Sequence, residues 1–398
     1  MYARKKWVRL ALCAALLGTG LRGRGGDPSP AAGEAPARPP TIAWEALRRL
    51  QGIDLDANPA VKAALLKVLA QAQGTPQFVE IVDAFHLPGQ HPALLDFALS
   101  HPNTGAGVRA MRLLLRDGDL TGVRAALTGP RARAAVEALG HTADQRVVPM
   151  LAPLVSDSGR DLATRQAVVR ALVQVQEGAA ALLALARQGH LSPDLRLTAS
   201  TELNMVRWPA LKAEAARVLP LPQARNAQPL PPLALLAQMP GDATRGAAVF
   251  HRATVGCSNC HQVRGQGIDF GPNLSEIGTK LGKEALLEAI LDPSAGIAFG
   301  YEAWQIELRE GDEVYGLIAS ETPDELAMKT VGGIVTRYQK RDIVKRERQK
   351  LSIMPTGLQQ AMTTQDLVDL VTYLASLKKA PSSASGGAPA APGNPPAP

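Results

Sequence analysis

Cys257-Ser258-Asn259-Cys260-His261 is the most informative stretch of this 398-residue chain. Two cysteines separated by two residues lie on one short helical turn, so both thiols can add to the two vinyl groups along one edge of a porphyrin. The histidine after the second cysteine is then held beneath the ring, where its imidazole can bind the iron as the proximal ligand. The spacing therefore predicts a c-type haem attachment site made by Cys257, Cys260 and His261.

Two other kinds of site use the same Cys-x-x-Cys spacing. Half of a zinc site would need a second Cys or His pair nearby, and none follows in the sequence. A redox-active dithiol would need a strand–helix–strand context, which the flanking residues do not show. The haem interpretation is therefore favoured over both.

Composition favours a protein built mainly of helices. Aromatic residues make up only 4% of the chain, and Ala and Leu dominate. The formal net charge is +7, but residues 1–26 contribute six Lys and Arg side chains and no acid. The basic balance thus indicates a targeting segment and argues against nucleic acid as a partner. The length allows two or three domains.

Residues 1–24 have the features of an export signal. A basic start is followed by an apolar core, Leu10 to Leu17, that is too short to span a bilayer. Cys13 lies inside this core and follows Leu12, where a lipidation signal needs a small residue, so we expect an ordinary signal residue. Without the signal, only Cys257 and Cys260 remain. We therefore expect an exported, periplasmic protein that reaches a membrane only through its N-terminus.

Residues 25–40 are rich in Gly, Pro and Ala and predict a flexible linker. From about 41 to 219 the pattern is helical throughout, with apolar residues at helical spacing. Five times a turn or cap residue is followed by proline, which is typical of helix starts. These pairs are Asn58-Pro59, Thr75-Pro76, His91-Pro92, Gly129-Pro130 and Ser192-Pro193.

Residues 137–172 resemble a HEAT repeat. A first helix contains a Val148-Pro149-x-Leu151 step, an Asp-bearing turn follows, and a second helix carries Arg165 near its start. One such helix pair cannot bury its apolar face alone, whereas stacked pairs share a continuous core. We therefore predict a HEAT-like helical repeat domain over residues 41–219. The match is weak over 41–130, where a plain helical bundle is the alternative.

Residues 220–240 contain several prolines and predict a stiff linker between domains. Beyond it, Asp242 is expected to cap a helix that leads into the Cys-x-x-Cys-His stretch. Further helices are expected over 283–291 and from Thr363 or Thr364 to Leu377. Residues 380–398 are rich in Pro, Ala, Gly and Ser and predict a disordered tail.

The segment from about 299 to 350 has a different pattern. Its β-forming residues alternate, and turn signals separate the runs at Glu310-Gly311-Asp312, Thr322-Pro323-Asp324 and Gly332-Gly333. We predict a small, mostly antiparallel insertion of about five strands within an otherwise helical C-terminal domain.

An iron bound by one histidine has a further axial position, which takes a second protein ligand or an exogenous molecule. Met354 is the leading candidate because Pro355 and Gly357 follow it in a loop before the last helix. A thioether opposite an imidazole raises the reduction potential and favours electron transfer. The alternative is that Met354 only packs in a core. Weaker candidates are Met239, His251, Met328 and Met362.

The C-terminal part, about 241–379, resembles the Pirellula/Verrucomicrobium-type haem-binding domain of planctomycete and verrucomicrobial proteins. It covers about a third of the 398 residues. The residues that carry the resemblance are Gly241-Asp242, Arg245-Gly246, Val249-Phe250, Cys257-x-x-Cys260-His261, Gly271-Pro272-Asn273-Leu274-Ser275-x-Ile277-Gly278, Glu288-Ala-Ile-Leu-Asp292-Pro293-Ser294, Gly300-Tyr301-Glu302, Asp342-Ile343, Met354-Pro355-x-Gly357-Leu358 and Gln365-Asp366-Leu367.

The resemblance implies a class I-like cytochrome c fold interrupted by a β insertion. It implies one covalent haem c on Cys257 and Cys260, with His261 as the proximal ligand and Met354 as the distal ligand. The carbonyl of Pro272 is implied to accept the imidazole N–H and so fix its tautomer. The expected fold class is thus mainly α: HEAT-like repeats over 41–219, then a cytochrome c-like haem domain over 241–379 with the insertion at about 299–350.

Family members often join this domain to HEAT repeats and to a β-propeller dehydrogenase, for which this chain has no room. We therefore expect substrate oxidation on another polypeptide. The favoured hypothesis is an exported electron-transfer protein that is not itself an enzyme. Its helical repeats would dock a dehydrogenase or other redox partner, and it would pass the electrons to a downstream acceptor. The alternatives are a haem-based sensor with a labile sixth site and a scaffold with structural haem. A dihaem peroxidase would need a second Cys-x-x-Cys-His, which is missing.

Overall fold

The computed structural model describes residues 50, 52–221, 229–309 and 311–379. The helices and strands below all belong to one unit, the second of the chain, which begins at residue 53. The predicted signal (1–24), the first linker (25–40) and the tail (380–398) lie outside the described residues. In the described part, no helix combines the length and apolar character that crossing a membrane requires.

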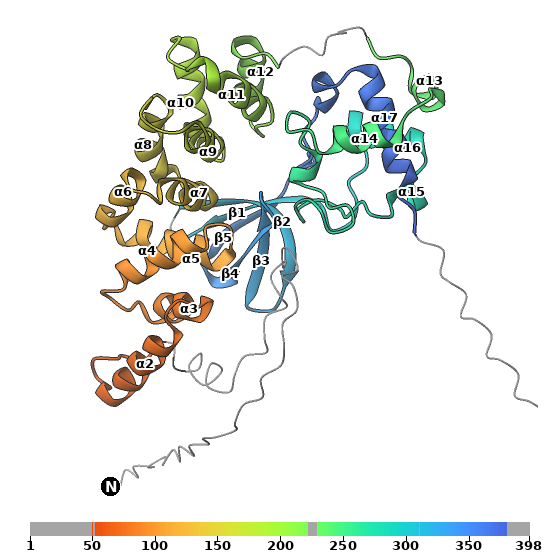
Figure 1. The fold of residues 1–398 in the computed structure, drawn as a ribbon. Coiled ribbons are helices and arrows are strands. Elements are labelled where there is room, and N and C mark those ends of the chain that lie inside the picture. The colour runs from red at the N-terminus through yellow and green to blue at the C-terminus, as the bar shows by residue number, and fades with distance from the viewer. Residues whose placement is uncertain (1–49, 51, 222–228, 310, 380–398) are drawn as a thin grey trace, which may run out of the picture. The chain divides into compact units, whose positions relative to one another are not determined.

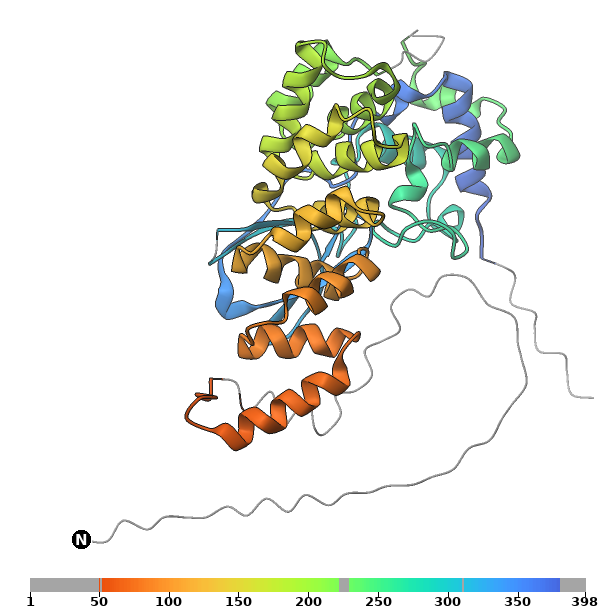
Figure 2. The ribbon, with the colours of Figure 1, turned by 60° about the vertical axis from the view of Figure 1, so that its left-hand side comes forward.

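The helical pattern predicted before residue 219 is confirmed, and we call residues 53–219 the helical region. Its helices are α2 (Pro59–Ala72), α3 (Pro76–Phe85), α4 (His91–Ser100), α5 (Gly105–Asp117), α6 (Thr121–Thr128), α7 (Ala132–Thr142), α8 (Val148–Leu151), α9 (Leu162–Leu172), α10 (Gln176–Arg187), α11 (Arg196–Asn204) and α12 (Pro209–Val218) (Figure 1). Contacts link α4 to α5, α5 to α7, α7 to α9, α9 to α11 and α11 to α12 (Figure 2). Each helix therefore buries its apolar face against near neighbours in the chain.

The proline signals locate most helix starts. Helices α2 and α3 begin at Pro59 and Pro76 as predicted, and α4 begins one residue early, at His91. The prediction at Gly129-Pro130 is wrong, because α7 begins only at Ala132. The amide of Ala132 donates to the carbonyl of Gly129, so Pro130 occupies the second position of a turn, which proline also favours.

The segment with the Val-Pro-x-Leu step is more broken than predicted. It forms α8, only four residues long, between the 3₁₀ helices η1 (Gln145–Val147) and η2 (Ala152–Val155). Pro149 and Pro153 lack the amide hydrogens that a longer α-helix would need there. A third 3₁₀ helix, η3 (Pro193–Leu195), begins at the predicted Pro193 and precedes α11.

The five-stranded antiparallel insertion is confirmed. Its strands are β1 (Ala303–Leu308), β2 (Glu313–Glu321), β3 (Glu325–Thr330), β4 (Ile334–Gln339) and β5 (Ile343–Arg348), in the order β4-β3-β2-β1-β5. Between β3 and β4, Gly332 and Gly333 adopt φ values of 88° and 74°, which glycine allows at little cost. The last strand pairs with β1, and the amide of Gln349 donates to the carbonyl of Ala303. The first and last strands of the insertion are therefore neighbours, so the chain enters and leaves the insertion at adjacent points of the sheet.

The rest of the C-terminal region, residues 229–379, is helical. It contains α13 (Leu233–Gln238), α14 (Ala243–Phe250), α15 (Ile277–Lys280), α16 (Lys283–Leu291) and α17 (Thr364–Ser376), with 3₁₀ helices η4 (Cys257–Asn259), η5 (Lys340–Asp342, between the last two strands) and η6 (Leu358–Ala361). The predicted cap, Asp242, accepts a hydrogen bond from the amide of Arg245 at the start of α14. The helix predicted over 283–291 and the last helix are confirmed as α16 and α17.

Helices α14 and α17 pack closely at their crossing. A Cβ atom at Gly246 of α14 would overlap the carbonyl oxygen of Asp369 in α17, so only glycine fits there. The core around them includes Val249, Phe250 and Leu367, all at most 1% exposed. This packing positions the chain that leaves α14 and enters the Cys-x-x-Cys-His stretch.

The predicted linker over 220–240 needs one correction. Residues 222–228 lie outside the description, but its last part forms α13, and Leu236 is buried in the core of the C-terminal region. Leu233 and Leu236 lie one helical turn apart and give this short helix an apolar face. This end of the linker is therefore a helix packed on the C-terminal region.

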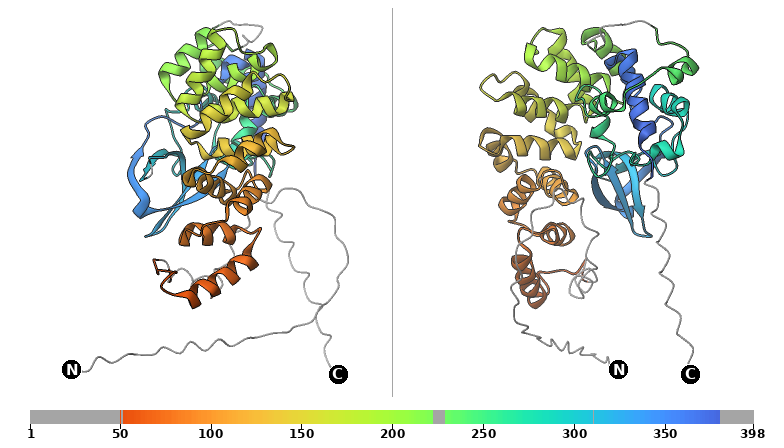
Figure 3. Two further views of the ribbon diagram at one scale, coloured as in Figure 1. Left: turned by 90° about the vertical axis from the view of Figure 1, so that its left-hand side faces the viewer. Right: turned by 45° about the vertical axis from the view of Figure 1, so that its right-hand side comes forward.

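The helical region contacts the insertion through α5, which packs on β4 (Figure 3). Arg112 donates to the hydroxyl of Tyr338 at 2.5 Å, and Arg109 donates to the carbonyl of Arg337 at 2.6 Å. A Cβ atom at Gly105 would overlap the carbonyl oxygen of Val335. The sheet thus connects the helical region to the helices that surround the Cys-x-x-Cys-His stretch.

Candidate haem-binding site

The Cys-x-x-Cys-His stretch forms the tight turn that its spacing predicts. Gly256 adopts a left-handed conformation with φ of 73° and caps η4. The carbonyl of Cys257 accepts hydrogen bonds from the amides of Cys260 at 3.2 Å and His261 at 2.9 Å. Both thiols and the imidazole therefore start from one turn of backbone.

The glycine-rich loop that follows is bonded back to this turn. The carbonyl of Cys260 accepts from the amides of Phe270 at 3.1 Å and Gly271 at 2.6 Å, and Ile268 donates to the carbonyl of Ser258 at 2.9 Å. A Cβ atom at Gly271 would come within 2.7 Å of Cε1 of His261. The loop thus lies directly against the imidazole ring, and glycine is required for that approach.

The orientation of His261 suits an iron ligand. Its Nδ1 lies 2.8 Å from the carbonyl oxygen of Pro272, the contact that the resemblance implied. A carbonyl only accepts hydrogen bonds, so Nδ1 carries the hydrogen and the lone pair of Nε2 is left for a metal. Burial lowers the pKa of His261, partly offset by the bond to Pro272, so the neutral, metal-binding form is favoured.

The two thiols do not have the electrostatics of a redox dithiol. Both are free and partly buried. Burial raises the pKa of Cys257 to about 12 and that of Cys260 to about 11. Redox-active cysteines instead have lowered pKa values. For the zinc alternative, no group of three or more His, Cys, Asp or Glu side chains that could hold a metal ion occurs among the described residues.

The turn opens into a cavity of about 2220 Å³. Typical small-molecule pockets measure about 300–1,000 Å³, so this larger space extends beyond the turn, along the helical region and the sheet. Its walls near the turn are mostly apolar and include Phe250, Leu274, Leu286, Ile290, Met362 and Leu370 beside Cys257, Cys260 and His261. Two thiols, one free imidazole nitrogen and an apolar wall match the chemistry of a covalently bound haem.

Met354 lines the same cavity as Cys257, Cys260 and His261. It is partly buried, and its amide donates to the hydroxyl of Ser352, whose own amide donates to the hydroxyl of Ser294. Of the weaker candidates, Met362 also lines the cavity but is 4% exposed and belongs to the core. The residues that line the cavity do not include Met239, His251 or Met328.

Sequence reasoning missed a second wall of the cavity, which the helical region provides. Glu202, Met205, Trp208 and Lys212 line it from α11, α12 and the segment between them. Burial raises the pKa of Glu202, partly countered by Arg170, whose Nε lies 3.4 Å from its carboxylate. These residues lie at least 45 positions before Cys257, so no local motif connects them with the site.

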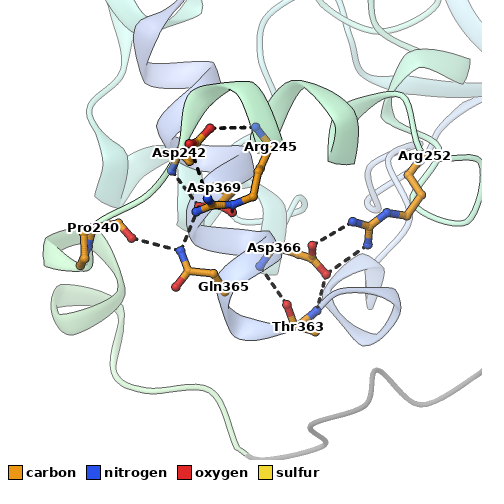
Figure 4. A network of polar contacts seen from close by, with 8 residues as sticks. All are labelled: Pro240, Asp242, Arg245, Arg252, Thr363, Gln365, Asp366 and Asp369. Carbon is orange, nitrogen blue, oxygen red and sulfur yellow. Dashed lines mark hydrogen bonds and ion pairs between the residues drawn. The ribbon is translucent and has the colours of Figure 1, made fainter.

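Two carboxylates of α17 hold α14 and the segment after it (Figure 4). Asp369, whose side chain is 3% exposed, accepts hydrogen bonds from Arg245, Gln365 and the amide of Asp242. Asp366 accepts from Arg252 at 2.8 Å and 3.1 Å. The hydrogen bond with Arg252 is the main cause that lowers the pKa of Asp366 to about 2. Both sets of contacts fix α14 and the segment that leads from it into the turn of Cys257 to His261, which we call the attachment turn.

Comparison with known proteins agrees with this geometry. A family model described as Cytochrome c matches residues 243–305. The match begins at α14, contains the attachment turn and ends in β1, so it includes Pro272 but not Met354. A search of curated proteins found no match. The fold and the matched family support a cytochrome c-like haem domain in this part of the chain and, with it, haem-based electron transfer.

Proposed function

We propose that this protein is an exported, periplasmic c-type cytochrome that holds one haem covalently and transfers single electrons. Cys257 and Cys260 would form the thioether bonds, and His261 and Met354 would bind the iron. The observation that carries the proposal is the orientation of His261. Its Nδ1 is hydrogen-bonded to the carbonyl of Pro272, and His261 lines the same cavity as the thiols of Cys257 and Cys260 and as Met354.

Each of these side chains has a defined task. A bound haem supplies an iron that takes up and releases one electron. The Pro272 carbonyl and Gly271 hold the imidazole of His261 in one orientation. The thioether of Met354 favours the reduced iron, and the apolar wall keeps water away, which also raises the reduction potential.

Substrate oxidation then takes place on another polypeptide. We propose that the HEAT-like repeats of the helical region dock a dehydrogenase and that the electron continues to a downstream acceptor. The protein itself acts as a carrier, without catalysis of its own, and has no nucleic-acid partner. Any membrane association runs through its N-terminus.

The first experiment is expression of the full chain in a bacterial host with and without periplasmic cytochrome c maturation. With maturation, we expect one haem per chain that survives denaturing electrophoresis. The double variant Cys257→Ala/Cys260→Ala should lose it. A colourless wild-type protein with free thiols would overturn the proposal.

The assignment of Met354 has its own test. Wild-type ferric protein should be low-spin, with a methionine-to-iron charge-transfer band, and Met354→Ala should lose that band and lower the reduction potential. Met362→Leu, at the other methionine of the cavity, is the control and should keep the band. A band that survives in Met354→Ala would exclude this ligand.

A second candidate is a haem-based sensor in which an exogenous ligand displaces Met354. It is favoured by the loop of Met354, because residues 351–356 make no backbone-to-backbone hydrogen bonds in the part of the chain that the structure describes. Rapid binding of CO to the ferrous wild-type protein, with a change in the circular dichroism of the helical region, would favour the sensor. Slow or absent CO binding favours the electron carrier.

A further inference from the structure

The segment between α11 and α12 is fixed on the sheet by Arg207. Its guanidinium lies over the rings of Trp208 and Tyr315, at 4.9 Å and 4.5 Å from their centroids. It also lies 3.6 Å from the carboxylate of Glu313 and 3.5 Å from the side-chain oxygen of Gln305. These contacts to β1 and β2 determine where α12 begins relative to the C-terminal region.

One turn further along, Lys212 reaches the loop that carries Met354. Its amide donates to the carbonyl of Trp208, the residue that precedes α12, so Lys212 belongs to the first turn of this helix. The ammonium donates to both the carbonyl oxygen and the hydroxyl of Thr356, at 3.1 Å and 3.0 Å. Thr356 lies two residues after Met354, and the next residue, Gly357, has a φ of 89°.

This contact is the strongest polar anchor of the loop. In the described part of the chain, residues 351–356 make no backbone-to-backbone hydrogen bonds. Their other polar contacts are the neutral bonds made by the amides of Ser352 and Met354. Hydrogen bonds from a charged donor are about twice as strong as neutral ones. Lys212 is partly buried, and this burial lowers its pKa because the charged ammonium loses contact with water. Its two hydrogen bonds to Thr356 offset that loss.

A second contact from the helical region reaches the same surroundings. Met205, at the end of α11, packs against the apolar core of the C-terminal region, the cluster against which Met354 also packs. The helical region therefore has two contacts near Met354: Lys212 bonds to Thr356, and Met205 packs against the same core as Met354.

We propose that Lys212 is a positioning residue for the axial methionine. It holds the Thr356 end of the turn that presents Met354, so the docking of the helical region on the sheet determines how firmly the sixth coordination position is held. The inference rests on the proposed function, in which Met354 binds the iron. It adds a control of that bond by a residue 142 positions away in the chain.

The test compares Lys212→Met, Lys212→Arg and the control Lys67→Met, an exposed lysine of α2. The readouts are the methionine-to-iron charge-transfer band and the rate at which added imidazole displaces the methionine from the ferric iron. Loss of a hydrogen bond to a charged group corresponds to roughly a tenfold change, so we expect Lys212→Met to accelerate displacement at least about tenfold. Lys212→Arg keeps a charged donor and should displace at close to the wild-type rate, as should Lys67→Met.

The outcomes separate the two proposals. A wild-type protein without the charge-transfer band contradicts the assignment of Met354, whatever Lys212 does. A wild-type band together with an unchanged displacement rate in Lys212→Met overturns the role of Lys212 alone. If Lys212→Met does not fold, Thr356→Val replaces it. That variant removes one of the two acceptors and should give a smaller acceleration of the same kind, and an unchanged rate would again overturn the inference.

Discussion

The imidazole of His261 owes its orientation to backbone atoms. The carbonyl of Pro272 selects the tautomer, and Gly271 leaves room for the ring edge. Because the loop that carries both residues is itself hydrogen-bonded to Cys260, this arrangement holds the ring in place before any iron is bound. The thiols of Cys257 and Cys260 start from the same turn, so the attachment residues form one preorganised unit.

Asp366 provides a pH-dependent test at the residue scale. Its pKa in the folded chain is about 2, whereas an unfolded aspartate titrates at about 3.9, so the unfolded chain binds the proton more readily. Its contribution to stability is therefore complete above about pH 4 and is lost as the pH falls towards 2. We expect Asp366→Asn to lower the free energy of unfolding by about 1 kcal/mol at pH 7, because it weakens the capping box and the pair with Arg252.

Urea unfolding of both proteins at several pH values between 2 and 7 measures this difference. It should shrink as the pH falls below 4, and Arg252→Gln should show the same trend. A difference that stays constant down to pH 2 would contradict the assignment of this pair.

Single residues of the site were predictable to different degrees. The spacing of Cys257, Cys260 and His261 is a local rule, and it was sufficient for the attachment turn. The contact between His261 and Pro272 spans 11 positions and came only from the resemblance. Lys212 was not predictable, because its partner lies 144 positions away and a lone lysine near a helix start has no special meaning.

At the scale of elements, the crossing of α14 and α17 supports the attachment turn. Helix α14 delivers the chain to Cys257, and the buried carboxylate of Asp369 bonds α17 to Arg245 and to the amide of Asp242. Close backbone contact at Gly246 lets these bonds form. The stability of the crossing and the position of the attachment turn are therefore linked.

Gly246→Ala tests this crossing. Within a helix, alanine is ordinarily more stable than glycine by about 1 kcal/mol. Here the added Cβ would overlap the carbonyl oxygen of Asp369, so we expect the variant to lose about 1–3 kcal/mol instead. Gly296→Ala, where an added Cβ meets nothing within 4 Å, is the control and should change stability by less than about 0.5 kcal/mol. Guanidinium unfolding measures both, and a stabilised Gly246→Ala variant would contradict the close crossing.

Helices and strands were predictable from the sequence wherever a local pattern determines them. Apolar periodicity located the helices, and turn residues separated the five strands. The start at Gly129-Pro130 was wrong because proline serves both helix starts and the second position of turns. The pairing of β5 with β1 was not predictable, because the two strands are far apart in the sequence and β5, which is almost wholly exposed, has no apolar pattern that selects a partner.

On the scale of the whole second unit, the sheet joins the helical region to the haem-binding part. Arg112 and Arg109 bond to Tyr338 and the carbonyl of Arg337, and Arg207 packs on Tyr315. The partners of Arg112 and Arg109 lie more than 220 positions away, which is why sequence patterns predicted two domains but not their contact. We therefore expect the two parts to unfold together.

Gly105→Ala tests that expectation. The added Cβ would overlap the carbonyl oxygen of Val335 and push α5 away from β4. In wild-type holoprotein, the far-ultraviolet circular dichroism and the haem absorbance should follow one unfolding transition. In Gly105→Ala, the dichroism should change at lower denaturant than the haem absorbance. Gly129→Ala, where the nearest atom is 3.4 Å from an added Cβ, is the control and should keep one transition. Coincident transitions at the wild-type midpoint in Gly105→Ala would contradict the coupling.

The neighbouring positions of β1 and β5 have a consequence for the history of the molecule. Because Ala303 and Gln349 are hydrogen-bonded to each other, everything between them leaves the haem-binding part and returns to it at a single point. A gene segment that encodes such an excursion can be gained or lost with its host fold preserved. A chain without this excursion would lack the strands on which Arg112 and Arg207 rest, so the attachment of the helical region to the C-terminal region depends on a segment that enters and leaves its host at one point.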